Sequence, residues 1–380
     1  MSNVESLRNS NEMMMETKKK ILILADFEGW AYDHKATALK KCLTQFNVEK
    51  RFYHEFTAAA RSNSSELNQY DAAIFLGFFY YHAEGAERQQ KISPEGSSIS
   101  LNLSFGSDSS LPKWPVGPLS KNELPKIVAT LTSWQFLHSN FNEAPALSRL
   151  YARSGAVSKT LYQKLIEWGA KDPVLCMNGV EEDLFVPLNK ATRPNGKLRV
   201  GWVGSIRNKE SGHTIDFKGF DAVLRPVMRE LLGLDIEFKV HRINSMDPSS
   251  IKSQEEMVEF YNDIDVYLST SHKYSEGTPN PAFEASSCGV PVVSTVNGCI
   301  EELISPGENG FIAKGWETDE EATVSAKEIC GFLQRISDSD DLLLRMKSAA
   351  RREIESNWTW QKKSLGYVRL LDGVLSDKNK

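Results

Sequence analysis

The segment SEGTPNPAFEASSCGVPVVST, residues 275–295, carries two glutamates eight positions apart, Glu276 and Glu284. Pro281 between them suits the first turn of a helix, whose positive N-terminus would attract an anion such as a diphosphate. Glu276 would lie in the preceding loop and face the polar end of a ligand. Glu284, about one turn inside the helix, could accept two hydrogen bonds from a vicinal diol such as ribose. The alternative is that both are surface acids that stabilise a helix end.

A second stretch, VGWVGS followed by DFKGF, could contact the same anion. Gly204 ends a predicted strand, and Lys218 precedes Gly219 at a predicted helix start. Glycine lets backbone amides approach phosphate oxygens closely, and lysine supplies a compact positive charge. The alternative is a tight turn followed by a solvated lysine.

Strands that alternate with helices must position these residues. The first half has predicted strands at 21–25, 50–53, 72–78 and 126–132, and the second half at 198–205, 236–243, 265–271 and 291–295. This alternation predicts two doubly wound parallel α/β sheets, in which ligands bind beyond the carboxyl ends of the strands.

The chain of 380 residues is long enough for two domains. We expect residues 1–17 to be a disordered tail and 18–185 to form the first domain, with a long loop at 83–121 that is functional or disordered. A Gly- and Pro-rich linker leads into the second domain, expected at 186–360. The last segment, 361–380, is expected to be a helix that could pack back on the first domain.

Composition excludes several classes of function. A net charge of -5 argues against nucleic acid as a partner. Five scattered cysteines without CxxC spacing and seven ungrouped histidines indicate neither disulfides nor a metal site, which favours the cytoplasm. No GxGxxG follows either first strand, which disfavours a nicotinamide dehydrogenase. No apolar run is long enough to cross a bilayer, while peripheral contact with the inner face of the membrane stays open.

Three elements resemble family 4 glycosyltransferases of the GT-B fold. EGTPNPAFEASSCGVPVVST resembles the family's E-x7-E signature, NGVEEDLFVP at 178–187 is similar to its interdomain element, and VGWVGS with KGF is similar to its donor phosphate loop. The resemblance covers residues 156–310. It implies two Rossmann-like α/β domains with doubly wound parallel sheets that face a cleft, followed by C-terminal helices.

The resemblance also implies an activity: transfer of a sugar from a nucleotide-diphosphate sugar to a hydroxyl acceptor, without a metal or other cofactor and with retention of configuration. Glu276 would hold the sugar and Lys218 would neutralise the departing diphosphate, so these are the implied catalytic residues. Glu284 would bind the ribose hydroxyls. The implied donor-binding residues are Gly204, Ser205, Arg207, Lys218, Gly277, Thr278, Pro279, Asn280 and Glu284.

The chain departs from the family pattern at two points. Family members commonly have an arginine directly after the phosphate-loop glycine, where this chain has Ser205, and Arg207 is the candidate replacement. Many members also have a sugar-contacting histidine after the fourth strand of the first domain, where this chain has Ser133 and Trp134, with His138 further on. The base, the sugar, the acceptor and the linkage therefore stay open, as does the oligomeric state.

The acceptor side is expected after the first strand, in ADFEGWAYDH. Asp26, Glu28 and Trp30 combine acids with an aromatic ring, as carbohydrate sites do, although Trp30 could equally be a core residue. Ser133 and His138 complete this predicted acceptor side, and a glycan or glycolipid would be the acceptor.

Two other functions stay possible. A nucleotide-sugar epimerase on the same scaffold would convert the donor without an acceptor, and a catalytically silent protein would bind sugar nucleotides or glycans only. Acceptor-dependent release of the nucleoside diphosphate separates the three. We expect a glycosyltransferase of glycan or polysaccharide biosynthesis.

Overall fold

The computed structural model describes residues 18–25, 28–52, 69–76, 89–92, 99–103, 114–119, 127–132, 145, 148, 151–188, 190–205, 216–243 and 250–376. Four candidate site residues, Asp26, Ser133, His138 and Arg207, lie outside these ranges, as does the predicted tail. By its internal contacts the chain forms two compact units. The smaller comprises Met1–Leu76, Gly85–Val128 and Leu371–Lys380, and the larger Gly77–Glu84 and Ala129–Leu370.

Buried aliphatic runs form a six-stranded sheet in the order β2-β1-β3-β7-β8-β9. Its strands are β1 (Lys20–Ala25), β2 (Asn47–Phe52), β3 (Ala72–Leu76), β7 (Ile127–Leu131), β8 (Arg153–Ala156) and β9 (Val174–Leu175). Every residue of 21–25 is fully buried, as expected of a parallel strand covered on both faces. Strand β1 pairs in parallel with β2 and β3. Helix α2 (Ala31–Cys42) links β1 to β2, and α5 (Lys159–Glu167) links β8 to β9.

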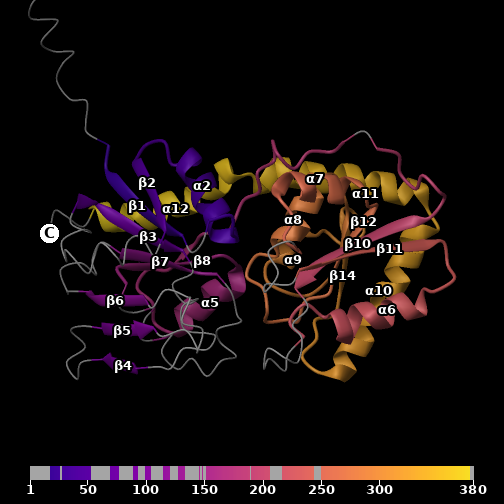
Figure 1. Ribbon diagram of the computed structural model, residues 1–380, viewed down its shortest axis with the longest axis horizontal. Helices are drawn as coiled ribbons and strands as arrows, with labels where there is room; N and C mark the ends of the chain where they lie inside the picture. The colour runs from indigo at the N-terminus through magenta and orange to yellow at the C-terminus, as the bar shows by residue number, and fades with distance from the viewer. Residues whose placement is uncertain are drawn as a thin grey trace, which may run out of the picture. The chain divides into compact units, whose positions relative to one another are not determined.

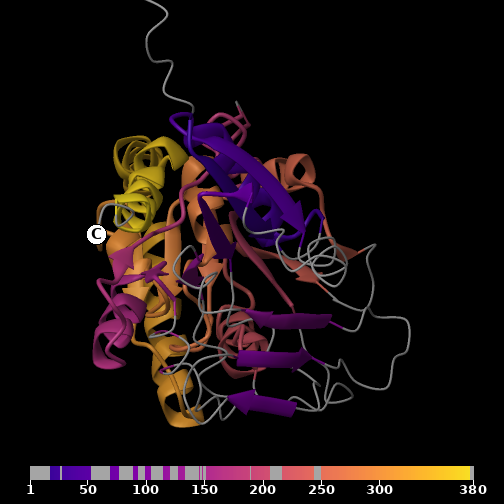
Figure 2. The same cartoon turned by 90° about the vertical axis from the view of Figure 1, so that its left-hand side faces the viewer.

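Residues 83–121, expected to be a long loop, contain three strands. β4 (Gln89–Ile92), β5 (Ile99–Leu103) and β6 (Trp114–Leu119) pair in an antiparallel sheet, seen as the stacked purple arrows of Figure 2. Ser, Gly and Pro around these strands favour loops, and this composition concealed the alternation of apolar and polar residues in ISLNL.

The second sheet is five-stranded and parallel, in the order β11-β10-β12-β13-β14 (Figure 1). Its strands are β10 (Leu198–Ser205), β11 (Ile236–Ile243), β12 (Val266–Ser269), β13 (Val292–Thr295) and β14 (Gly310–Ala313). Crossing from β10 to β11 on one edge and from β10 to β12 on the other makes the sheet doubly wound. The predicted fold class is thereby confirmed for this half of the chain.

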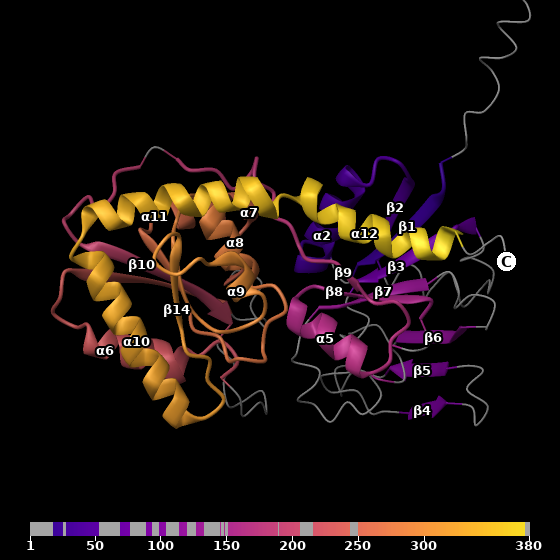
Figure 3. The same ribbon diagram turned by 180° about the vertical axis from the view of Figure 1, so that it is seen from behind.

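Helices cover both faces of the second sheet (Figures 1 and 3). One face packs against η6 (Phe220–Leu224), α6 (Arg225–Glu230), α10 (Asp319–Ser337) and α11 (Asp340–Glu353), and the other against α7 (Gln254–Asn262), α8 (Asn280–Ser287), α9 (Ile300–Leu303) and η8 (Ile354–Trp358). The adjacent residues Trp202 and Val203 of β10 point into these two different cores. Alternation of this kind is expected of a strand whose successive side chains face opposite sides.

The helix expected over residues 218–232 is divided in the structure. It begins with the π-helical turn η6 and continues as α6, with Pro226 in the first turn of α6. Proline has no N–H to donate to the preceding turn, so the regular α-helical pattern cannot run through it.

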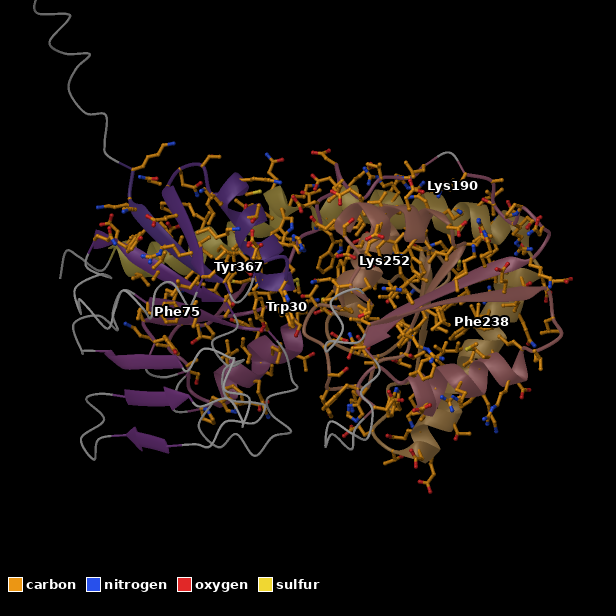
Figure 4. The ribbon with its side chains drawn as sticks, in the orientation of Figure 1. Trp30, Phe75, Lys190, Phe238, Lys252 and Tyr367 are labelled. Carbon is orange, nitrogen blue, oxygen red and sulfur yellow. The ribbon has the colours of Figure 1, made fainter. Side chains whose placement is uncertain are left out.

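The last helix, α12 (Trp360–Leu375), packs against the end of the first sheet. The hydroxyl of Tyr367, labelled in Figure 4, donates to the Cys176 carbonyl at 3.0 Å. A Cβ at Gly366 would stand 2.6 Å from the Leu175 carbonyl oxygen, so glycine permits this close approach. Within the described residues, no helix has both the length and the apolarity needed to cross a bilayer.

Candidate active site

A pocket opens where β10 and β12 end. Its lining comes from the strand ends, from the turn before η6 and from the segment that leads into α8. The lining residues are Trp202, Val203, Lys218, Tyr267, Ser269, Thr270, Ser271, Glu276, Pro279 and Pro281. Carboxyl ends of parallel strands are where α/β sheets bind ligands. The pocket thus brings together Lys218 and Glu276, which are 58 positions apart in the chain.

Thr270 fixes the backbone of Lys218. The Thr270 hydroxyl donates to the Lys218 carbonyl at 2.7 Å and accepts from the buried Trp202 indole at 2.9 Å. The Thr270 carbonyl accepts from the Trp316 indole at 3.0 Å. Gly219 has φ +66°, and a Cβ there would stand 2.1 Å from the same carbonyl oxygen. Only glycine therefore fits beside Lys218.

Lys218 forms an ion pair with Glu276. The side chains are 26% and 12% exposed, so each charge is partly shielded from water. Ser271 also donates to Glu276, at 3.1 Å, and both bonds go to Oε1. Among the described residues, no hydrogen bond reaches Oε2 of Glu276. This oxygen is available to accept a hydroxyl from a ligand.

The two helix starts near the pocket differ. At η6 the carboxylate of Asp216 accepts hydrogen bonds from the amides of Phe220, Asp221 and Ala222, at 2.7–3.0 Å. That end already holds an anion from the protein itself. At α8 the residue before the helix is Pro279, which offers no side-chain acceptor. The amides of Asn280 and Ala282 bond to the Thr278 and Pro279 carbonyls, but no carboxylate of the described side chains offsets the helix dipole at α8 as Asp216 does at η6.

Close backbone contacts hold the loop before α8 within the larger compact unit. A Cβ at Gly277 would stand 1.9 Å from the Thr132 carbonyl oxygen, and one at Gly298, where φ is +51°, would stand 2.6 Å from the Gly277 carbonyl oxygen. The Thr278 hydroxyl donates to the Val157 carbonyl at 3.3 Å. The predicted donor-binding residues from Gly277 to Asn280 thus lie on a firmly packed loop.

Glu284 lies one turn inside α8 and is half-buried. Its Oε2 accepts the hydroxyl of Tyr261 at 2.7 Å. Burial raises the pKa of Glu284 to about 7, with the Tyr261 bond acting in the opposite direction and the nearby Glu181 adding to the rise. Glu284 is not among the lining residues. Both Glu276 and Glu284 contribute, after burial, to raising the pKa of Tyr267, which does line the pocket.

The other predicted residues are less closely tied to the pocket. Gly204 and Ser205 end β10 and are not among the lining residues, although a Cβ at Gly204 would come within 3.3 Å of the Lys218 Cβ. Glu28 and Trp30 belong to the smaller compact unit. Trp30, labelled in Figure 4, is 40% exposed just before α2, so it is not a core residue.

Sequence reasoning missed the residues that support the site. Thr270 and Ser271 directly follow β12, and this position at the carboxyl end of a strand could have indicated that they belong to the site. No sequence pattern pointed to Tyr261, which lies on a different helix from its partner Glu284. In the part of the chain that the structure describes, no three His, Cys, Asp or Glu side chains are grouped as metal ligands.

One family model matches part of the second α/β half, from α7 to α11. Residues 249–351 match the family described as "Glycosyl transferases group 1". Spore coat protein SA of Bacillus subtilis is 29% identical over 105 residues, which cover 27% of this chain and 25% of that protein. The capsular polysaccharide biosynthesis glycosyltransferase CapM of Staphylococcus aureus is 23% identical over 229 residues, 54% of this chain and 57% of that protein. The matches thus span a quarter and just over half of these two relatives.

Structural similarity extends over almost the whole chain. The crystal structure of Anabaena Alr3699/HepE in complex with UDP and glucose aligns with 93% of this chain and 99% of its own, with a TM-score of 0.59 and 13% identity. At this identity the alignment supports the fold, and the two parallel α/β sheets with their C-terminal helices follow the same plan. The chain therefore has the GT-B fold, and residues 249–351 within its second α/β half match the glycosyl transferase group 1 family.

Proposed function

We propose that this protein is a glycosyltransferase that moves a sugar from a nucleoside-diphosphate sugar to a hydroxyl acceptor, with retention of configuration. The observation that carries the proposal is the meeting of Lys218 and Glu276 in one pocket beside the uncapped start of α8. A cation and a helix N-terminus can bind the diphosphate of such a donor, and a carboxylate oxygen can bind its sugar hydroxyls.

The leaving diphosphate would be stabilised by Lys218 and by the N-terminus of α8. Negative charge grows on the diphosphate oxygens as the glycosidic bond breaks. Positive groups placed beside these oxygens stabilise the transition state more than the ground state, an effect usually worth several kcal/mol. These two groups supply the positive charge without a metal ion.

Glu276 and Glu284 would bind hydroxyls at the two ends of the donor. Glu276 offers its Oε2 to the sugar, while its Oε1 stays with Ser271. Lys218, now paired with Glu276, would turn toward the diphosphate when the donor enters. Glu284 would accept from the ribose. No protein nucleophile is needed if the acceptor hydroxyl attacks from the face that the leaving group vacates.

The donor and the pathway follow from the comparisons as proposals. The Anabaena structure contains UDP and glucose, so UDP-sugars are the first donors to test. The CapM relative is described as acting in capsular polysaccharide biosynthesis, which favours a glycan or glycolipid acceptor. Glu28 and Trp30, with Asp26, Ser133 and His138, remain candidates for binding it. We place the reaction in the cytoplasm, including the inner face of the membrane.

The test compares two alanine variants by turnover and by nucleoside-diphosphate affinity. Glu276→Ala should abolish acceptor-dependent release of the diphosphate while the nucleoside diphosphate still binds, because Lys218 loses its competing partner. Glu284→Ala should weaken binding of the nucleoside diphosphate itself. Glu301→Ala, at an exposed glutamate of α9, serves as the control that leaves both unchanged.

Full activity in both site variants would refute the assignment. Conversion of the donor sugar in the absence of any acceptor would identify an epimerase instead. Binding of the donor with no turnover toward a broad panel of acceptors would favour a binding protein.

A further inference from the structure

Within the described residues, the side chain that bonds to the carboxylate of Glu284 is that of Tyr261, of α7. The Tyr261 hydroxyl donates to Oε2 of Glu284 at 2.7 Å. The Tyr261 side chain is fully buried, and its ring makes edge or tilted contacts with the rings of Phe185, Phe260 and Tyr267, with centroid distances of 5.7–6.1 Å. A ring fixed on three sides leaves its hydroxyl little freedom. The hydroxyl therefore has a fixed position from which it bonds to one oxygen of the carboxylate.

We propose that Tyr261 is a positioning residue that orients Glu284 toward the ribose of the donor and keeps it in the form that accepts two hydrogen bonds. The inference rests on the proposed function, since it takes Glu284 to be the ribose-binding carboxylate. It adds a second helix, α7, to the donor site.

The hydrogen-bonding capacities of the two groups fit this role. A phenol has one proton to donate, and Tyr261 gives it to Oε2. An ionised carboxylate has about four acceptor sites on two oxygens, so one oxygen and part of the other remain for a diol. A protonated carboxyl group offers fewer sites and weaker bonds, because bonds to a charged acceptor are roughly twice as strong.

The electrostatic surroundings make the ionised form sensitive to Tyr261. Burial raises the pKa of Glu284 to about 7, and the hydrogen bond from Tyr261 is the contribution that lowers it. The carboxylate of Glu181 raises it further. Near neutral pH, Glu284 is thus poised between its two forms, and the hydroxyl favours the ionised one.

The other elements that pack on α8 place few ionisable groups around Glu284. Tyr267 of β12 and Cys288 at the end of α8 both have a raised pKa, to which Glu284 contributes after burial. Arg351 of α11 bonds to the Ser287 carbonyl and pairs with Glu355 of η8. Strand β13 (VVST) has no ionisable side chain. Of the groups in the described ranges, the Tyr261 hydroxyl is the one whose hydrogen bond goes to the Glu284 carboxylate.

The experiment measures donor affinity against pH for Tyr261→Phe. Calorimetry would use whichever of UDP-, GDP- or ADP-glucose binds the wild type most tightly, between pH 6 and 9. The diphosphate diester of these donors does not titrate in that range. The control is Tyr367→Phe, which also removes one buried tyrosine hydroxyl bond, to the Cys176 carbonyl, in a different helix.

Wild-type affinity should increase as the pH rises through about 7, because binding favours the ionised Glu284. In Tyr261→Phe the donor affinity at pH 7 should fall roughly tenfold and should recover toward the wild-type value as the pH is raised. The midpoint of the curve of affinity against pH should therefore lie at a higher pH than in the wild type. Tyr367→Phe should follow the wild type. In a Tyr261→Phe, Glu284→Gln double variant the loss should not exceed that of Glu284→Gln, because both act through one carboxylate.

Three outcomes would overturn the inference. If Tyr261→Phe binds like the wild type at every pH while Glu284→Ala weakens binding, the positioning role fails and the proposed function stands. A loss in Tyr261→Phe that is equal at all pH values would indicate a structural role only. If the wild type binds none of the three donors, or Glu284→Ala binds normally, the proposed function fails together with the inference.

Discussion

Replacing Glu284 by glutamine should make the protein more stable, and the gain should depend on pH. The folded protein raises the pKa of Glu284 from its ordinary value of 4.5 to about 7. Between these values the folded state holds a proton that the unfolded state has released, so the free energy of unfolding falls as the pH rises. Above pH 7 Glu284 is ionised in both the folded and the unfolded state, and the full decrease in the free energy of unfolding is present.

The magnitude follows from the size of the shift. A difference of about 2.5 units at about 1.36 kcal/mol per unit corresponds to roughly 3 kcal/mol above pH 7. Below pH 4.5 the loss vanishes. Glutamine carries no charge and its amide oxygen can still accept the Tyr261 hydroxyl, so Glu284→Gln removes the loss and keeps the bond. About 1 kcal/mol shifts the melting temperature by roughly 2–4 °C in a unit of this size, so an increase of roughly 6–12 °C is the upper bound at pH 8.

Thermal unfolding at pH 5 and at pH 8 tests this prediction. The advantage of Glu284→Gln over the wild type should be about 2 kcal/mol larger at pH 8 than at pH 5. Glu301→Gln, at the exposed α9 position, should unfold like the wild type at both pH values. An equal advantage at the two pH values, or none at pH 8, would refute the reasoning that burial holds a proton on Glu284.

Two further predictions concern the pocket. Lys218→Met should lower turnover by roughly a hundredfold or more without unfolding the protein, because it removes a charge next to the leaving group from a partly exposed side chain; unchanged turnover under single-turnover conditions would exclude Lys218 from the chemistry. Gly277→Ala should displace the loop before α8 and abolish turnover, because its Cβ would stand 1.9 Å from the Thr132 carbonyl oxygen. The matched control Gly331→Ala meets no atom within 4 Å in α10 and should stabilise that helix by up to about 1 kcal/mol; wild-type turnover in Gly277→Ala would show that the loop can move without loss.

Buried runs made the sheets predictable from the sequence. ILILA and PVVST can form only strands covered on both faces, and their alternation with helices determines the doubly wound plan. The strands β4–β6 escaped prediction because their neighbours are Ser, Gly and Pro. The helix after Lys218 was predicted without its π-helical start, which depends on Pro226.

The sequence singled out individual candidate residues but not their pairings. Lys218 and Glu276 each had a recognisable context, yet their ion pair depends on the geometry of two loops that are far apart in sequence. Contacts between helices, such as the bond from Tyr261 to Glu284, leave no periodic trace in a sequence. The pKa of Glu284 depends on burial, which only the packed structure defines.

The central claim is that Lys218 and the start of α8 bind the diphosphate of a sugar nucleotide. A crystal structure with a bound nucleoside diphosphate tests it most directly. The account predicts that Lys218 leaves Glu276 and contacts the diphosphate, that the first turn of α8 faces the same phosphates, and that Glu284 accepts from the ribose. A diphosphate bound away from α8, with Lys218 still paired to Glu276, would contradict it.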